Sequence, residues 1–280
     1  MNALQIKNAT KRYDRFQLKN LTLTLPSGCI MGLIGENGAG KSTTIKLILD
    51  MIHLDSGTIT LWGKKNTDHI HLTKQDIGVV LDEVGIPSCL TVKQVGNIMK
   101  HTFENWDQSL FSHYLDKLSI PRNKPYKDFS KGNKMKLGIA IALSHHPKLL
   151  ILDEATSGLD PIVRDEVINL FNEFTRDENH SILISSHIIS DLEKICDYIA
   201  FLHQGELLLC EEKDLLLSRY GLLQCPQEQL LQLNPAAIKA KRISAYGAEA
   251  LVLRDQIPPT LSVNPVSLEE LFIFLIKERA

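Results

Sequence analysis

The feature that most constrains this chain is the stretch GENGAGKS at residues 35–42, which fits the pattern G-x-x-x-x-G-K-[ST]. It follows the apolar run CIMGLI (29–34), which predicts a strand, and precedes KSTTIKLILDMI (41–52), which has helical spacing. In a strand–loop–helix unit of this kind, successive backbone N–H groups wrap a phosphate chain at the helix N-terminus. Lys41 can reach the terminal phosphates and the Ser42 hydroxyl can bind Mg²⁺, so we predict a nucleoside triphosphate site. The predicted contacts are Gly35, Glu36, Asn37, Gly38, Ala39, Gly40, Lys41, Ser42 and Thr43.

Two adjacent carboxylates follow a second apolar run, in LLILDEATSGLD (149–160). In enzymes with a phosphate loop, an aspartate at this place holds Mg²⁺, and the next residue points toward the water that attacks the γ-phosphate. We therefore predict that Asp153 binds Mg²⁺ and that Glu154 is the general base. The segment SSH (185–187) ends another apolar run, which puts His187 at the same sheet edge. There it can hydrogen-bond the γ-phosphate or the attacking water.

Apolar runs and helical segments alternate along the chain, which favours an α/β fold. KLLILD (148–153) and SILISS (181–186) are continuous apolar runs, typical of parallel strands that are covered on both faces. A helical stretch at 162–178 separates them, and residues 91–145 predict a helical insertion broken near two prolines.

The pattern weakens beyond residue 221. Residues 223–242 are ambiguous between helix and strand, ALVLRD (250–255) predicts a strand, and SLEELFIFLIKE (267–278) predicts a terminal helix.

Composition excludes several classes of protein. The 280 residues are 44% hydrophobic, enough for a large core, and the formal net charge is -2. This balance argues against a polyanion-binding protein, so we expect no nucleic-acid partner. The five cysteines lie far apart without a CxxC pair, which indicates a reducing compartment. The chain shows no signal-peptide core and no run of roughly 18 apolar residues that could span a bilayer. We expect a cytoplasmic protein that serves a membrane only through a partner.

The stretch FSKGNKMKL (129–137) crowds three lysines at the predicted start of a helix. The positive end of a helix dipole makes lysine unfavourable there, so we expect an anion close by. The alternative is that Lys131, Lys134 and Lys136 form a solvated helix face, an interpretation that suits Lys136 best.

Taken together, these segments resemble the ATP-binding subunits of ABC transporters over about residues 3–220. The resemblance lies in an ordered set of motifs: GENGAGKST, FSKGNKMKL, LLILDE, SGLD and SSH, with Tyr13 ahead of the first. It implies ATP and Mg²⁺ as cofactors and a P-loop NTPase (RecA-like) core with an N-terminal antiparallel β subdomain. It also implies an ATP-binding domain at 1–220 with an inserted α-helical subdomain at about 85–145. A small C-terminal appendage of uncertain fold follows at 221–280.

The resemblance assigns roles to four further residues. Tyr13 matches the aromatic residue that stacks on adenine, although an ordinary core residue is the alternative. Ser130 and Gly132 match signature residues that contact the γ-phosphate of a nucleotide bound to the other subunit. The anion expected near the lysines would then belong to the second half of a dimer. Asp160 matches the aspartate that organises the contact between two nucleotide sites.

One position departs from the family pattern. Relatives commonly carry glutamine where IGVVLDE (77–83) has Asp82, and that glutamine binds Mg²⁺ and senses the membrane partner. A carboxylate can still bind Mg²⁺, and the neighbouring Glu83 is an alternative to Asp82. The predicted metal ligands are therefore Ser42, Asp153 and Asp82. The signature motif also departs, with Lys131 at its first glycine position and Asn133 at its final glutamine position.

The resemblance also implies a mechanism. Two such subunits, in a homodimer or a heterodimer, enclose two ATP molecules and move a separate transmembrane permease docked near the helical subdomain and residues 77–83. The expected location is peripheral, on the inner face of the cell membrane. The tail NPVSLEELFIFLIKE (264–278) is similar to an ending of exporter-type members, which favours export; the alternative is an amphipathic helix that packs on its own domain. Two other functions stay open: a non-transport ABC ATPase, and a catalytically impaired regulatory subunit of a heterodimeric transporter.

Overall fold

The computed structural model describes residues 1–68, 74–82, 85–244 and 247–277. The strands are β1 (Asn2–Tyr13), β2 (Phe16–Pro26), β3 (Ile30–Gly35), β4 (Ser56–Leu61), β5 (Lys64–Lys65), β6 (Ile77–Val80), β7 (Leu149–Asp153), β8 (Ser181–Ser186), β9 (Tyr198–His203), β10 (Glu206–Glu212), β11 (Tyr220–Cys225), β12 (Ile238–Ser244), β13 (Gly247–Leu253) and β14 (Val263–Asn264). The α-helices are α1 (Lys41–Ile48), α3 (Val92–Thr102), α4 (Gln108–Lys117), α5 (Lys131–Leu143), α6 (Pro161–Phe174), α7 (Ile189–Ile195), α8 (Lys213–Arg219), α9 (Gln227–Leu231) and α10 (Leu268–Lys277). Three short 3₁₀ turns are η1 (Tyr126–Asp128), η2 (Pro235–Ala237) and η3 (Arg254–Gln256).

A mixed sheet in the order β10-β9-β3-β8-β7-β6 forms the centre of the molecule, and its only antiparallel pair among the described strands is β10–β9. Every residue of β7 and β8 is buried, as their continuous apolar runs predicted. Successive side chains point to opposite faces of a strand. Accordingly, Leu150 and Leu152 lie in the core shared with α5 and α6, whereas Leu149 and Ile151 lie in the core shared with α1. The carboxyl ends of the parallel strands meet at one edge.

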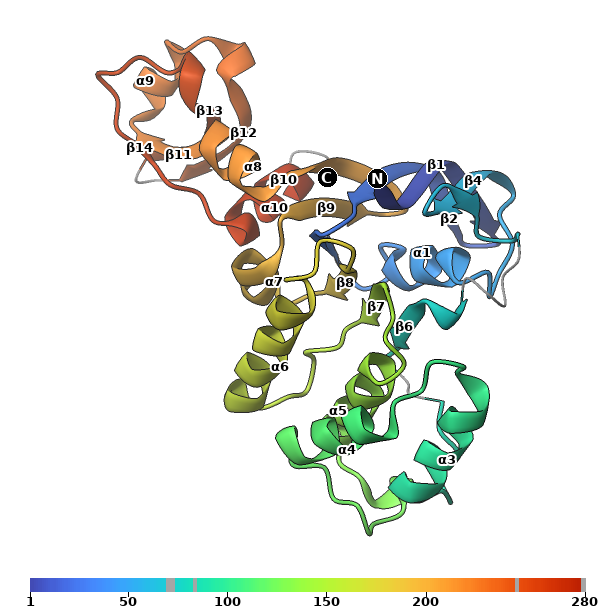
Figure 1. Ribbon diagram of the computed structural model, residues 1–280. Coiled ribbons are helices and arrows are strands. Elements are labelled where there is room, and N and C mark those ends of the chain that lie inside the picture. Colours follow the sequence, from blue (N-terminus) through green and yellow to red (C-terminus); the bar gives the residue numbers. More distant parts are fainter. Residues whose placement is uncertain (69–73, 83–84, 245–246, 278–280) are drawn as a thin grey trace.

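A second, antiparallel sheet in the order β2-β1-β4-β5 lies on the α1 side of the central sheet (Figure 1). Leu4 and Ile6 of β1 are fully buried in the same core as Ile45 of α1. This sheet confirms the antiparallel β part of the predicted fold class.

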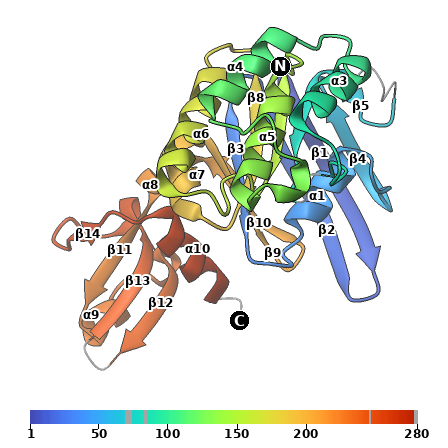
Figure 2. The ribbon, with the colours of Figure 1, turned by 90° about the horizontal axis from the view of Figure 1, so that it is seen from below.

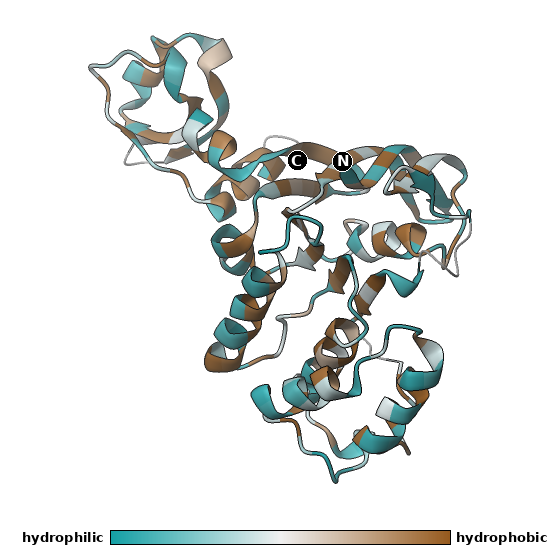
Figure 3. Ribbon diagram, in the orientation of Figure 1, coloured by the Kyte–Doolittle hydropathy of each residue, from teal (hydrophilic) through white to brown (hydrophobic). Residues whose placement is uncertain are grey.

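The helices α3, α4 and α5 form a group that projects away from the two sheets (Figure 1). The helix α4 ends at Lys117, and η1 begins after Pro125, in agreement with the predicted breaks. Helix α5 is hydrophobic in its second half (Figure 3), where each residue from 137 to 143 is buried. The helical insertion of the fold class is thus confirmed, while the boundaries 85–145 and 1–220 stay predictions.

The first helix is shorter than the pattern at 41–52 predicted. It ends at Ile48, and Asp50 adopts the left-handed conformation with φ 51°. The side-chain amide of Asn66 donates hydrogen bonds to the carbonyls of Leu47 (2.8 Å) and Ile48 (3.1 Å). These bonds satisfy carbonyl groups that the end of a helix leaves without partners.

The C-terminal part contains a third sheet, in the order β12-β13-β11-β14, with a small core of its own (Figure 2). The predicted terminal helix, α10, follows it and packs both on β12 of this sheet and on α7 beside the central sheet. The ring of Phe272 lies 5.0 Å from that of Phe201 in β9, and the backbone N–H of Leu268 donates to Glu193 of α7 (3.2 Å). The helix thus packs within its own chain, as the alternative to an exporter-type ending expects, while the likeness to that ending stays a prediction.

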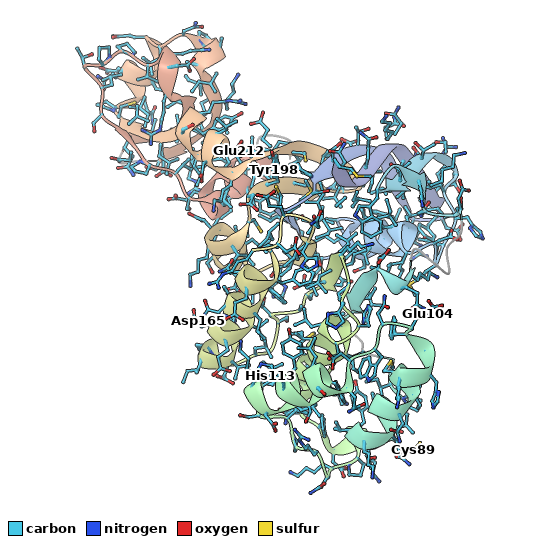
Figure 4. All side chains as sticks on the ribbon, in the orientation of Figure 1. Cys89, Glu104, His113, Asp165, Tyr198 and Glu212 are labelled. Carbon is cyan, nitrogen blue, oxygen red and sulfur yellow. The ribbon has the colours of Figure 1, made fainter. Side chains whose placement is uncertain are left out.

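All five cysteines are free thiols. Cys89 is exposed on the helical insertion, far from Tyr198 and Glu212 of the central sheet (Figure 4). Cys196 is fully buried, and this burial raises the pKa of its thiol. Within the described ranges, every helix is too short or too polar to cross a membrane.

Candidate active site

A cavity of about 520 Å³ lies at the carboxyl edge of the central sheet, where the loop after β3 meets the ends of β6 and β7. Its lining residues are Arg15, Phe16, Glu36, Asn37, Gly38, Gly40, Lys41, Ser42, Thr43, Asp82, Asp153 and Glu154. Most residues of the predicted phosphate loop therefore lie together with Asp82, Asp153 and Glu154. Such a crevice at the ends of parallel strands is the usual ligand site of an α/β sheet.

The glycines of the phosphate loop have positive φ angles where the loop turns into α1. Gly40 has φ 111°, and a Cβ atom there would come within 2.9 Å of the ring of Phe16. Lys41 is buried, and its ammonium group donates hydrogen bonds to the carbonyls of Gly35 (2.6 Å) and Glu36 (3.2 Å). The loop thus holds its lysine folded back over its own backbone.

Glu154 is held from two sides. Its φ of 55° is uncommon for a residue other than glycine, and its backbone N–H donates to the carbonyl of Ser185 (3.1 Å). Nδ1 of His187 lies 2.6 Å from Oε2 of Glu154, so the carboxylate accepts a hydrogen bond from the ring. The ammonium group of Lys41 lies 3.7 Å from the other oxygen, Oε1. Glu154, His187 and Lys41 therefore form one connected group.

Asp153 is buried beside Ser185, a residue that was not singled out from the sequence. The two are register partners on β7 and β8, and the Ser185 hydroxyl donates to a carboxylate oxygen of Asp153. The motif SSH could have indicated Ser185, because this serine, two places before His187, lies at the same sheet edge as Asp153. Ser185 fixes the direction of the carboxylate.

The hairpin turn between β1 and β2 carries the predicted adenine contact. Tyr13 is 47% exposed and does not line the cavity, whereas its neighbours Arg15 and Phe16 do. The rings of Tyr13 and Phe16 are 6.4 Å apart. Arg15 and Phe16 were missed from the sequence, because nothing in KRYDRF shows which residues of a turn face the phosphate loop.

The structure does not bring Ser130, Gly132 or Asp160 into this cavity. Ser130 is exposed and caps α5, since its hydroxyl oxygen accepts a hydrogen bond from the N–H of Asn133 (3.2 Å). Asp160 is exposed and caps α6 in the same way, at 3.1 Å from the N–H of Val163. Gly132 faces the SGLD turn, where an added Cβ would lie 3.6 Å from the carbonyl of Gly158. These residues form a separate exposed corner, called here the signature corner.

Each of the three lysines at this corner has a partner within the chain. Lys131 forms an ion pair with Asp82 at 2.9 Å. The ammonium group of Lys134 lies 5.2 Å from the centre of the Tyr126 ring, and that of half-buried Lys136 donates to the carbonyl of Leu118 (3.0 Å). The interpretation of Lys136 as a solvated residue is therefore wrong.

The predicted metal ligands offer hard oxygen donors, which suit Mg²⁺. Ser42, Asp153 and Asp82 all line the cavity. The buried carboxylate of Asp153 accepts a hydrogen bond from Ser185, and a cation in the cavity would further offset the cost of burying this charge. One oxygen of Asp82 is already paired with Lys131. Glu83, the alternative to Asp82, lies outside the described residues.

A second hollow, an apolar groove of about 610 Å³, lies between β6, α3 and α5. Its lining includes Ile77, Val79, Leu81, Met99, Phe103, Ile141 and His145. His145 is buried, its ring stacks on Phe103 at 3.9 Å, and its two nitrogens lie 3.2 and 3.3 Å from the carbonyls of Ile77 and Ile141. Burial lowers the pKa of His145, although these backbone contacts oppose the shift.

The fold and the cavity together define a P-loop nucleoside triphosphatase, and comparison with known proteins gives the family. Residues 18–157 match the family described as "ABC transporter". The bacitracin transport ATP-binding protein BcrA of Enterococcus faecalis is 34% identical over 73% of this chain and 68% of its own length. The lantibiotic transport ATP-binding protein SrtF of Streptococcus pyogenes is 36% identical over 75% and 91%. The ABC transporter ATP-binding protein YtrB of Bacillus subtilis is 30% identical over 96% and 97%.

A solved ATP-binding subunit of an ABC transporter is 26% identical, with a TM-score of 0.69 over 76% of this chain and 90% of that chain. The ATP-binding cassette MJ0796, in a dimer bound to ADP and Pi, shares the fold at 22% identity, with a TM-score of 0.68 over 75% and 98%. The chain belongs to the ATP-binding proteins of the ABC transporter family. It binds ATP and is an ATP hydrolase of that family.

Proposed function

We propose that this chain is the ATP-hydrolysing subunit of an exporter, which dimerises around ATP and drives a separate membrane subunit. The observation that carries the proposal is the connected group of Glu154, His187 and Lys41 beside the phosphate loop. This arrangement supports an active enzyme over an impaired regulatory subunit, because the predicted base is already oriented by its neighbour.

In the proposed mechanism, backbone N–H groups of the loop bind the phosphate chain, and Lys41 exchanges its carbonyl partners for the terminal phosphates. Ser42 and Asp153, with Asp82 when it is released from Lys131, would hold Mg²⁺, which neutralises phosphate charge when bound. Glu154 accepts the proton of the attacking water, while His187 keeps the carboxylate in place.

The exposed signature corner supports dimerisation. Ser130, Gly132 and Asp160 lie outside their own cavity, so within one chain they have no access to its triphosphate. A second subunit, identical or homologous, would bring its own corner over the opposite cavity. The turn of Tyr13, half exposed near the loop, would supply the platform for adenine.

The apolar groove supports a membrane partner. Leu81 lines the groove and the next residue, Asp82, lines the nucleotide cavity, so one short segment faces both sites. A helix of a transmembrane permease, with an apolar side for Phe103 and Met99, fits this groove. The chain would then lie peripherally on the inner face of the cell membrane.

The relatives favour a cargo class. Two of them are named for transport of bacitracin and of a lantibiotic, and both names denote antibiotic compounds. We therefore propose export of antimicrobial peptides or similar amphipathic compounds. Expression with the cognate membrane subunit should raise the resistance of a sensitive host to such a compound, and a Glu154→Gln variant should not.

The central experiment uses Glu154→Gln in the purified chain. Turnover should fall by about 10²- to 10⁴-fold, because a general base is lost, while ATP binding persists and dimers accumulate with Mg²⁺ and ATP. Light scattering and a phosphate-release assay measure the two effects. Full turnover in this variant would contradict the role of Glu154.

A separate purification of the native chain in detergent tests the alternative function. A permease should copurify with this chain, and its absence would favour a non-transport ATPase.

A further inference from the structure

The lysine at the start of α5 already has an anion within its own chain. Lys131 is the first residue of the helix, where the dipole disfavours a cation. Its ammonium group lies 2.9 Å from Oδ1 of Asp82, which follows β6 and lines the nucleotide cavity. The pair therefore ties the signature corner to the chain's own nucleotide site.

The stem of Lys131 also covers the neighbouring turn. Gly158 has φ 77°, and a Cβ atom there would lie 3.3 Å from Cδ of Lys131. The lysine thus runs across the SGLD turn, which ends at the exposed Asp160, before it reaches Asp82. One side chain joins the loop after β6, the start of α5 and the turn before α6.

We propose that the Asp82–Lys131 ion pair is an autoinhibitory latch, which closes in the nucleotide-free chain and opens when two subunits join around ATP. The proposal rests on the proposed dimer. While the latch is closed, Lys131 points to its own cavity and covers the turn that a second subunit would meet. It also withholds one oxygen of Asp82 from Mg²⁺.

The latch is weak enough to be opened by nucleotide. Both side chains are about half exposed, at 56% and 51%, and exposed ion pairs contribute little because water and salt screen them. Incoming Mg²⁺ competes for Asp82 and the partner's triphosphate competes for Lys131. Removing the latch should therefore shift dimerisation by a few fold and not by orders of magnitude.

The first test measures dimerisation in the Glu154→Gln background, by light scattering against ATP concentration with Mg²⁺. Asp82→Asn should lower the ATP concentration at half-maximal dimer by about 2- to 5-fold. Because the variant also removes a negative charge from the cavity, nucleotide affinity of the monomer is measured separately at low protein concentration. The shift in dimerisation must exceed the shift in monomer affinity. An equal shift, no shift, or a shift to higher ATP overturns the latch.

The matched control is Glu173→Gln. Glu173 pairs with Lys117 at the same distance, 2.9 Å, with side chains 50% and 38% exposed, and the pair joins α6 to the helical insertion away from the cavity. This variant should leave the dimerisation midpoint unchanged. A shift equal to that of Asp82→Asn would show a general charge effect and would overturn the proposal.

The second test needs no dimer. Hydrogen exchange of the first turn of α5 is measured without nucleotide in Asp82→Lys, Lys131→Asp and the doubly reversed chain. Asp82→Lys should speed exchange at the N–H groups of Asn133 and Lys134, which donate hydrogen bonds to Ser130. An acidic residue suits the helix start by itself, so Lys131→Asp should slow exchange more in the Asp82→Lys chain than in the original chain. This additional slowing is the recovery expected from the restored ion pair. No recovery in the double variant overturns the latch even where Glu154→Gln dimers form. Recovery without any ATP-dependent dimer supports the latch and contradicts the proposed function instead.

Discussion

The nucleotide cavity and the signature corner of this chain differ in how firmly their side chains are held. Lys41 and Asp153 are each only 6% exposed and are held by hydrogen bonds from neighbouring strands and loops. Ser130 and Asp160 are exposed, and each side chain is engaged only as the cap of its own helix among the contacts described. The residues of the cavity are thus held in place within the chain, whereas those of the signature corner are exposed to solvent.

This difference indicates what fixes the geometry of each site. Catalytic groups stabilise a transition state best when they are fixed before the substrate arrives. The nucleotide cavity meets this requirement within one chain, whereas in the proposed dimer the signature corner meets it only when a second chain covers it. The following predictions test that contrast.

The largest expected effect separates the two functions of Ser130. Ser130→Asn keeps an acceptor that can cap α5 but removes the hydroxyl proposed to contact the partner's nucleotide. Turnover should fall by about 10²-fold with ATP binding to the monomer unchanged, as for loss of one donor to the transition state.

Asp107→Asn is the matched control for Ser130, because Asp107 caps α4 with two hydrogen bonds of 2.8 and 2.9 Å. It should leave turnover within twofold of the original chain. If both variants lose activity equally, the corner acts only through helix stability.

A smaller effect concerns the two aromatic residues of the β1–β2 turn. Tyr13→Leu should weaken ATP binding by about 2- to 10-fold, the range of one aromatic contact, without changing thermal unfolding. Phe16→Leu should instead lower the free energy of unfolding by about 1 kcal/mol, because the Phe16 ring packs over Gly40. Calorimetric titration and thermal melts measure both. The reverse pattern would move the adenine platform from Tyr13 to Phe16.

The smallest effect is a pH dependence in the groove. Because burial lowers the pKa of His145, the unfolded chain binds more protons than the folded chain between the folded pKa and about 6.5. The folded state should therefore lose stability as the pH falls through this window. His145→Leu should flatten the slope in urea melts at pH 5 to 7.5, whereas His101→Asn, at an exposed position of α3, should keep it. An unchanged slope in His145→Leu would contradict a neutral buried ring.

The sequence was most informative where the candidate site residues lie in short contiguous motifs. The phosphate loop, the pair Asp153 and Glu154, and His187 could each be found from a short motif beside an apolar run, and the structure brings them together. The place of each motif directly after a strand was enough to predict that they meet, because the carboxyl ends of parallel strands lie at one edge of the sheet.

Contacts between distant segments could not be found in this way. The pair of Asp82 and Lys131 joins residues 49 positions apart (131 minus 82), and neither neighbourhood specifies the other. In the third sheet only the strand predicted at 250–255 corresponds to an observed one, β13. Residues 223–242 alternate weakly, and β12 becomes a strand through its pairing with β13. The roles of Tyr13, Ser130, Gly132 and Asp160 stay predictions.

The return of α10 to the central sheet has a practical consequence for anyone who wishes to shorten this protein. Phe272 is 7% exposed against Phe201, and Leu268 and Leu271 are wholly covered beside α7. A chain that ends after residue 220 would expose this apolar surface to water and would aggregate. Because the last helix connects the C-terminal sheet to the central sheet, the whole chain is best expressed, purified and crystallised without truncation.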